Sequence, residues 1–326
     1  MKKHFYRITC ALAFAITLIV SGCSTPNKPL TIPNKPLAIP KIKMQNAKVN
    51  IKAVQKGPIE ISIASLQELD ALFDKYQYSS ESWEKGKQKL PRITFEKVPD
   101  NWQKKSQNLP VETKKSFFFR LMAPLILMAN ENIIGEREIV KDDPLNSPEL
   151  KKIALKYRLI KSKKKSITTA MRNTLLNKVD ILPPSLALAQ AAEESGWGTS
   201  RFAQEGNAFF GQWDFSGNGM KPKQQRKALG NYGVARFDSP LASVKGYMLN
   251  INTHNAYNQL RRVRAQLRAR NKKITGLELV GTLNKYSERG QAYIDGLREM
   301  IRYNKLQFVD NSYLADNRLI HLTSGK

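Results

Sequence analysis

Apolar side chains recur at helical spacing through the first half of the chain. Residues 65–76 open with Ser-Leu-Gln-Glu, a capping box, and continue with leucine and aromatic residues three or four positions apart. Residues 117–129 are densely apolar but are interrupted by Arg120 and Pro124, and they are too short to cross a membrane. This stretch is predicted to be a buried core helix. Residues 59–164 are therefore expected to form a helical extension that carries no chemistry of its own.

A second helix, over 185–194, has small or apolar residues on almost every face, which is typical of a buried helix. Gly196 is expected to end it. Its last turn carries Glu193 and Glu194, although the partial negative charge of a helix C-terminus disfavours carboxylates. Burial and the helix dipole both raise the pKa of a carboxyl group there, as a general acid for glycoside cleavage requires. Solvated glutamates at an exposed helix end are an equally good interpretation on physical grounds alone.

The N-terminus has the pattern of a bacterial lipoprotein signal. Three basic residues precede the uncharged apolar stretch 8–20, which is shorter than the roughly 20 residues of a membrane span but suits an export signal. Val-Ser-Gly then precedes Cys23, as in a lipobox. We expect residues 1–22 to be removed and Cys23 to carry lipid. Ser24 favours a periplasmic protein anchored to the outer membrane, and a plain signal peptide with an incidental cysteine is the alternative.

Residues 23–58 are rich in proline and lysine, and the sequence Pro-Asn-Lys-Pro-Leu occurs in them twice. Proline-rich sequence of one charge sign favours an extended chain that rises about 3.1 Å per residue. This segment is predicted to be a solvated tether between the anchor and the folded part of the protein.

The charge balance calls for an anionic partner. The chain has 54 lysine and arginine residues against 27 acidic ones, a formal net charge of +27. Because the signal predicts export, we expect an anionic cell wall or membrane surface and no nucleic acid. The basic run over 261–273 lies on a predicted helix and is a candidate for holding wall polymers, although a solvated basic face is the commoner explanation.

Cysteine and histidine are too scarce for several kinds of site. Cys10 and Cys23 both lie in or directly after the predicted signal, which excludes a disulfide framework and a thiol nucleophile in the mature fold. Only His254 and His321 follow the signal, and His321 lies in a predicted polar tail over 311–326. We therefore expect no metal site and no cofactor.

Three blocks of sequence resemble the family 73 glucosaminidases, and among them the Bax-like branch. They are QAAEESGWGTSRFAQEGNAFFGQW (190–213), YGVARFDSPLASVKGYMLNINTHNAY (232–257) and YSERGQAYIDGLREMI (286–301). The family hallmark is a glutamate directly before Ser-Gly-Trp-Gly, followed by Asn-x-x-Phe-Gly. The resemblance implies a catalytic domain over 165–310 with a mainly α (α+β, lysozyme-like) fold and a small β-hairpin lobe near 209–237. It also implies activity on the β-1,4 bond between N-acetylglucosamine and N-acetylmuramic acid of peptidoglycan.

Carried over by position, the resemblance implies that Glu194 is the general acid and that Tyr286 at the cleft wall positions substrate or water. Asn207 either binds an acetamido group or holds the turn after its helix. Trp197 and Phe210 are candidate substrate-binding residues, although packing beneath the cleft is the commoner role for such side chains. Glu193 is about 100° around the helix from Glu194, so the two glutamates are not expected to face one cleft.

The sequence departs from many relatives in the hairpin, where a second acid is common. Residues 217–236 contain no acidic residue, and the nearest carboxylates are those of Glu205, Asp214 and Asp238. Asp214 is our candidate for the second acid. Without one, Glu194 would act alone, assisted by the acetamido group of the substrate or by a water held by a tyrosine.

The predicted function is peptidoglycan hydrolysis after N-acetylglucosamine, with a single glutamic acid as proton donor. Two alternatives stay open. A lytic transglycosylase would use one glutamate on the same substrate, and the missing hairpin acid suits it. A non-catalytic lipoprotein would bind the wall and tether it to the membrane.

Overall fold

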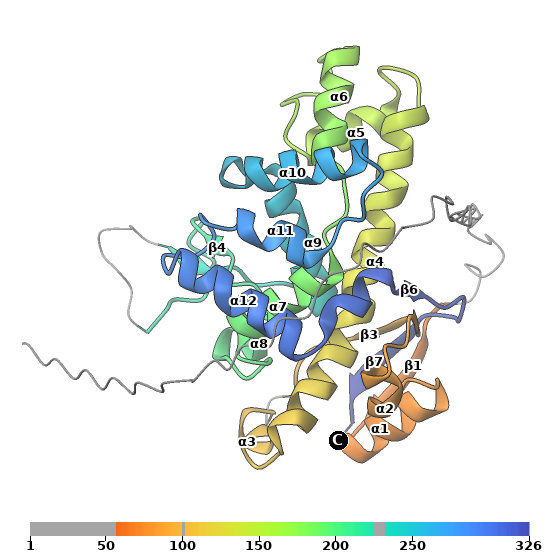
Figure 1. The fold of residues 1–326 in the computed structure, drawn as a ribbon, viewed down its shortest axis with the longest axis vertical. Coiled ribbons are helices and arrows are strands. Elements are labelled where there is room, and N and C mark those ends of the chain that lie inside the picture. Colours follow the sequence, from red (N-terminus) through yellow and green to blue (C-terminus); the bar gives the residue numbers. More distant parts are fainter. Residues whose placement is uncertain (1–56, 100–101, 224–231, 326) are drawn as a thin grey trace, which may run out of the picture. The chain divides into compact units, whose positions relative to one another are not determined.

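The computed structural model describes residues 57–99, 102–223 and 232–325, and these form a mainly α-helical fold with small β-sheets (Figure 1). The predicted signal, Cys23 and the tether up to residue 56 lie outside the described residues. The first α-helices are α1 (Leu66–Lys75), α2 (Ser80–Glu84), α3 (Trp102–Gln107), α4 (Val111–Asp142), α5 (Pro148–Lys156) and α6 (Thr169–Lys178). They are followed by α7 (Pro184–Ser195), α8 (Arg201–Gly206), α9 (Pro240–Thr253), α10 (Asn258–Ala269), α11 (Gly276–Leu279) and α12 (Gln291–Tyr303). Short 3-10 helices are η3 (Asn255–Tyr257), η4 (Val280–Thr282) and η5 (Leu306–Asn311).

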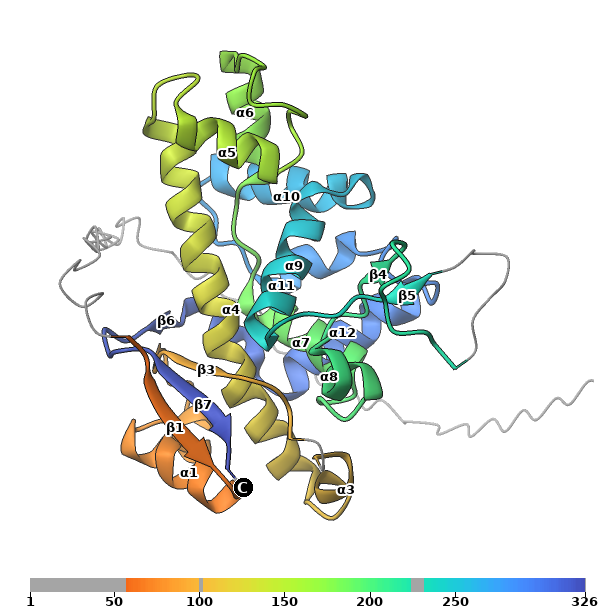
Figure 2. The ribbon, with the colours of Figure 1, turned by 180° about the vertical axis from the view of Figure 1, so that it is seen from behind.

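Helix α4 is the element around which the others pack. It contacts α5, α6, α7 and α9, and both views place α5 and α6 at one of its ends and α1 near the other (Figures 1 and 2). Among the described helices, α4 alone is long and apolar enough to cross a membrane, but 78% of its most apolar stretch is buried inside the fold. Arg120 within it is buried and pairs with Asp70 at 2.9 Å. The predicted core helix is confirmed, and it runs on through Pro124.

Strands from both ends of the chain form a three-stranded sheet. Strands β1 (Ile59–Ile63) and β3 (Ile93–Phe95) both pair in parallel with β7 (Ile320–Ser324), which is the central strand. A second pair joins β2 (Lys89–Leu90) to β6 (Tyr313–Leu314).

Two expectations are corrected by this sheet. The extension over 59–164 contains strands as well as helices, and residues 311–326 are not a polar tail, because they supply β6 and β7. Ile320 and Leu322 are buried and alternate with His321 and Thr323, the period of two that a half-buried strand requires. So short an apolar pattern does not by itself predict a strand, and the two strands that pair with it lie more than 200 residues away in sequence.

A small β-lobe stands beside the helices. Strands β4 (Trp213–Asp214) and β5 (Gly233–Val234) pair antiparallel, and Met220 bridges to Val234. Ala208, Met220 and Val234 form an apolar cluster of their own, separate from the main core. Gly233 packs so closely on the backbone of Gly219 that an added Cβ would lie 2.7 Å from its carbonyl carbon. The predicted class, mainly α with a small β-hairpin lobe, is confirmed.

The basic run over 261–273 is only partly a surface feature. Arg261 and Arg264 are buried, and Arg264 donates to the carbonyl oxygens of Asp180 and Ile181 at 3.0 and 2.8 Å. Arg268 forms an ion pair with the buried carboxylate of Asp180. Three cations of this run thus bind backbone carbonyls or a carboxylate of the fold, which removes them from the predicted wall-binding surface.

Candidate active site

Helix α7 is held at its N-terminus by contacts distant in sequence and ends at a local glycine cap. Near its N-terminus, Asp310 Oδ1 accepts from the Ser185 N–H at 2.9 Å, and Asp310 Oδ2 accepts from the Ser185 hydroxyl and the Gly276 N–H at 2.8 and 3.0 Å. At the other end, Gly196 takes the left-handed conformation, with φ of 56°. Its side chains are buried up to the last turn, as predicted. The helix therefore presents that last turn at a defined position.

Glu194 is partly buried in this last turn. The Tyr293 hydroxyl donates to Glu194 Oε1 at 2.8 Å, and Oε2 lies 3.3 Å from the point that a Cβ on Gly211 would occupy. Burial raises the pKa of Glu194 above its ordinary value, and the nearby charge of Glu193 raises it further. The hydrogen bond from Tyr293 and the charge of Arg289 act in the opposite direction without cancelling the effect of burial. The carboxyl group therefore keeps its proton to a higher pH than an exposed glutamate.

A chain of hydrogen bonds positions this carboxyl group. The Tyr247 hydroxyl donates to Gln190 Oε1 at 2.6 Å, and Gln190 Nε2 donates to the Tyr293 hydroxyl at 3.1 Å. Tyr293 in turn donates to Glu194. Gln190 and Glu194 are four residues apart and share one face of α7. Side chains from α7, α9 and α12 thus fix one oxygen of Glu194.

Tyr286 lies beside this chain rather than in it. Its ring stacks on that of Tyr293, with centroids 5.6 Å apart and an interplanar angle of 7°, and its hydroxyl donates to the Phe210 carbonyl at 3.1 Å. Burial raises the pKa of Tyr286 well above its ordinary value and that of neighbouring Tyr257 to about 12, so both hydroxyls are neutral donors. The predicted role of Tyr286 at the cleft wall stays a prediction.

Glu193 faces a different partner. Its carboxylate pairs with Arg289 Nη2 at 2.5 Å, and the guanidinium group of Arg289 lies 5.2 Å from the centre of the Tyr293 ring. The two adjacent glutamates therefore have different direct partners, in agreement with the helical geometry, while their charges still influence each other.

Asp214, the candidate second acid, is bonded within its own turn. Its Oδ1 accepts from the Ser216 N–H at 2.8 Å and its Oδ2 from the Ser216 hydroxyl at 2.9 Å. Hydrogen bonds from the backbone and side chain of Ser216 lower the pKa of Asp214. These contacts give Asp214 a turn-forming role and keep it ionised, and its assignment as an acid stays a prediction.

The other predicted site residues serve packing and turn geometry. Asn207 adopts the left-handed conformation at the end of α8 and donates to the Phe237 carbonyl at 3.2 Å, while its buried Oδ1 has no partner in the structure. Phe210 is buried, and its ring stacks on Tyr247 at 4.0 Å. Trp197 packs edge-on against Phe119, with centroids 5.2 Å apart. Phe210 therefore reaches the Glu194 site through its backbone, by way of Tyr286.

Sequence reasoning assigned no role to Tyr293, Gln190 or Tyr247. One signal for Gln190 was available, because it is a polar residue in an otherwise apolar helix and lies four positions before Glu194. Tyr293 comes from the third family block and Tyr247 from the second, and only the folded chain brings them into one hydrogen-bond chain with Glu194.

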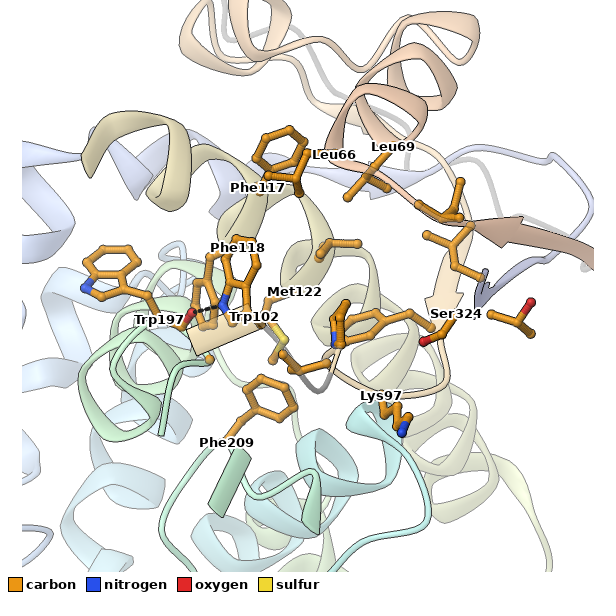
Figure 3. Close-up of a pocket in the computed structure, with 18 residues that line it drawn as sticks. Leu66, Leu69, Lys97, Trp102, Phe117, Phe118, Met122, Trp197, Phe209 and Ser324 are labelled. Atoms are coloured by element: carbon orange, nitrogen blue, oxygen red, sulfur yellow. Dashed lines mark hydrogen bonds between the residues drawn. The ribbon is translucent and has the colours of Figure 1, made fainter. Parts of the chain in front are cut away.

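An apolar cavity of about 110 Å³ lies behind the turn that follows Glu194 (Figure 3). Helices α1, α3 and α4 line it together with Trp197, Gly198 and Phe209. The indole N–H of Trp102 donates to the Trp197 carbonyl at 3.2 Å across one side of it. Glu194 is not among its lining residues, so the cavity belongs to the junction between the extension and the catalytic region.

Across the described ranges, no group of three or more histidine, cysteine, aspartate or glutamate side chains is placed to hold a metal ion. The site presents a carboxyl group with a raised pKa that tyrosine side chains orient. Such a group can deliver a proton to a leaving oxygen.

Comparisons with known proteins show the family of the chain. The family model described as Mannosyl-glycoprotein endo-beta-N-acetylglucosaminidase, or Glucosaminidase, matches residues 170–306. The protein named Protein bax, from Escherichia coli strain K12, is 35% identical over 199 residues, which cover 59% of this chain and 70% of that protein. No solved structure matches the chain. The chain therefore belongs to the glucosaminidase family of glycosidase-type enzymes, in its Bax-like branch.

Proposed function

We propose that this protein is a peptidoglycan hydrolase that cleaves the β-1,4 bond after N-acetylglucosamine, with Glu194 as the general acid. The observation that carries the proposal is the partly buried Glu194 carboxyl, with its raised pKa and its hydrogen bond from Tyr293, inside the family domain. A glutamic acid that keeps its proton near neutral pH is the group that protonates a glycosidic oxygen.

The hydrogen bond from Tyr293 indicates which oxygen carries the proton. Because Oε1 accepts from the tyrosine hydroxyl, the acidic proton belongs on Oε2, beside the backbone of Gly211. The proton passes to the glycosidic oxygen as its bond to the sugar C1 breaks. A water oxygen then bonds to C1 and loses its own proton, which restores the acid when Glu194 accepts it.

The positive charge that develops on C1 during this step must be stabilised by a nearby oxygen. Asp214 is bonded to Ser216 in its own turn, which supports a mechanism without a second protein carboxylate. The substrate's own acetamido oxygen, or a water held near Tyr286, then assists. The same observation favours the second candidate function, a lytic transglycosylase, in which a hydroxyl of muramic acid attacks in place of water.

The test is a digest of purified sacculi by the wild-type chain and by Glu194→Gln, with Glu193→Gln as the matched control. Glu194→Gln should lower muropeptide release at least about 10²–10⁴-fold, the usual contribution of general acid catalysis. Glu193→Gln should cost little, because Glu193 pairs with Arg289 outside the hydrogen-bond chain. Near-normal release by Glu194→Gln would contradict the assignment.

The folding of Glu194→Gln is checked by its thermal midpoint. The pKa of Glu194 is raised in the folded state, so ionisation of this group lowers stability as the pH rises through that value. At neutral pH the glutamine variant should therefore unfold at the same or a higher temperature than the wild type. A loss of activity in this variant is then a loss of chemistry.

The products decide between the candidate functions. Mass spectrometry that finds reducing N-acetylglucosamine ends supports the hydrolase, and anhydro-muramic ends support the transglycosylase. Binding to sacculi without release of muropeptides at any pH supports a non-catalytic tether.

We also propose that Cys23 carries lipid and anchors the protein in the periplasm, at the outer membrane. The support is the apolar stretch 8–20 followed by Val-Ser-Gly before the cysteine, with Ser24 after it. Cys23→Ala should abolish incorporation of labelled palmitate and leave precursor or soluble protein. Labelling of the variant at the wild-type level would exclude the anchor.

A further inference from the structure

Two large aromatic side chains are exposed on the β-lobe. Trp213 is 52% exposed and Phe215 is 66% exposed, and their ring centroids are 5.9 Å apart. This short distance between the rings puts both on one surface. Asp214 between them accepts from the Ser216 N–H in its own turn. The pair makes a small apolar surface that the core of the protein does not use.

The Trp213 ring is held in place before any ligand arrives. It stacks on Tyr232 with centroids 5.0 Å apart and an interplanar angle of 27°, and Tyr232 is buried. The segment before it is fixed as well, since the Ala235 N–H donates to the Gln212 carbonyl at 2.8 Å. A ring already fixed in this way loses little conformational entropy when a ligand packs on its exposed part.

The position of this surface relative to Glu194 follows from chain geometry. Gly211 lies against Oε2 of Glu194, the oxygen proposed to carry the proton. An extended chain spans at most about 3.6 Å per residue, so the Cα of Trp213 is within roughly 7 Å of that of Gly211, and the Cα of Phe215 within roughly 14 Å. The backbone of the aromatic pair therefore lies within two to four residues of the Gly211 backbone that contacts Glu194.

We propose that Trp213 and Phe215 form a glycan-binding subsite that holds an N-acetylated sugar ring of the glycan strand next to the bond that is cleaved. This inference rests on the proposed function, because the occupant is the part of the substrate that extends from Glu194. A pyranose ring has a face of C–H bonds, and the negative face of an aromatic ring attracts these polarised hydrogens. The continuity with Glu194 through Gly211 selects a sugar as the occupant rather than a partner protein.

The test measures binding without cleavage, in the full chain carrying Glu194→Gln. The probes are tetra-N-acetylchitotetraose, by titration calorimetry, and intact sacculi, by co-sedimentation. Trp213→Ala and Phe215→Ala should each weaken binding of the oligosaccharide at least about tenfold, the equivalent of ~1.4 kcal/mol. Phe215→Leu should weaken it as well, whereas Phe215→Tyr, which keeps an aromatic face, should bind within a few-fold of the parent.

Tyr303→Ala is the matched control, because Tyr303 is an aromatic residue that is 70% exposed at the end of α12. It should bind both probes as the parent does. Since Trp213 also stacks on Tyr232, Trp213→Phe and the thermal midpoint of each variant separate lost binding from lost folding.

Each outcome decides the proposal. Binding by Trp213→Ala and Phe215→Ala within twofold of the parent overturns it, as does an equal loss in Tyr303→Ala or a parent that binds neither probe. If the wild type releases no muropeptides while Trp213→Ala loses binding, the subsite stands and the proposed hydrolase function fails. If the wild type cleaves sacculi and the aromatic variants bind normally, the subsite alone fails.

Discussion

At the scale of single residues, Glu193 and Glu194 show how strongly surroundings control a carboxyl group. They are adjacent in the sequence, yet one pairs with Arg289 and the other accepts from Tyr293 in a partly buried position. Burial raises the pKa of Glu194, and the polar groups around it adjust that effect in both directions. The acid proposed for catalysis is thus made by neighbours from α12 as much as by its own helix.

These opposing influences predict two shifts of the pH–activity profile in opposite directions. The hydrogen bond from Tyr293 favours the ionised form, so Tyr293→Phe should raise the pKa of Glu194 and move the alkaline limb of kcat/KM to higher pH. The charge of Glu193 favours the protonated form, so Glu193→Gln should move the same limb to lower pH. Muropeptide release measured across the pH range checks both.

If Tyr293 or Glu193 had only a structural role, its substitution would change the rate without moving the alkaline limb of the pH–activity profile. Shifts in the same direction for the two variants would contradict the assignment of the limb to Glu194.

At the scale of elements, contacts at the N-terminus of α7 hold the helix whose last turn carries Glu194. Asp310 from η5 accepts three hydrogen bonds, two from Ser185 and one from Gly276. It thereby joins α7, α11 and η5 at the end opposite to Glu194. Burial raises the pKa of Asp310, so keeping its carboxylate ionised costs free energy. The hydrogen bonds from Ser185 and Gly276 act in the opposite direction.

Asp310→Ala should therefore lower the free energy of unfolding by about 1–3 kcal/mol, because two backbone N–H groups lose their acceptor. Ser185→Ala is the matched control, since it removes only the hydroxyl bond and should cost about 1 kcal/mol or less. Urea denaturation of both variants measures the difference. A smaller loss in Asp310→Ala than in Ser185→Ala would contradict the capping role.

At the scale of the whole described fold, the extension and the catalytic region share one core. The main hydrophobic cluster runs from Leu69 in α1 to Leu322 in β7 and includes the buried face of α7. Strand β7 closes the sheet of the extension although it follows the catalytic region in sequence. The described residues from 57 to 325 are therefore expected to unfold together.

Ile320→Ala tests this coupling. Ile320 is buried in the central strand, so its truncation should lower the free energy of unfolding by about 2–5 kcal/mol. Loss of muropeptide release on heating should follow the same lowered transition. Asp316→Ala, at an exposed position between β6 and β7, should stay within about 0.5 kcal/mol of the wild type. Equal stability of Ile320→Ala and the wild type would restore the interpretation of this segment as a tail.

What could be predicted from the sequence was local in origin. The Ser65 cap of α1, the apolar central part of α4, and the start and end of α7 follow from residues within a few positions of one another. The β-hairpin and the mainly α class followed from the family blocks, whose residues are contiguous. Helix periodicity, capping and glycine turns act over one or two turns of chain, so a linear pattern is sufficient to reveal them.

Tertiary structure alone decided which distant residues meet. It placed Tyr293 on Glu194, Asp310 at the start of α7, Arg264 on the loop carbonyls, and β7 between β1 and β3. A tyrosine, an aspartate, an arginine or an alternation of apolar and polar residues looks the same in the sequence whether it is exposed to solvent or buried in a core. The role of such a residue depends on the partner that offsets the free-energy cost of burying its polar groups. In each of these cases that partner is tens to hundreds of residues away.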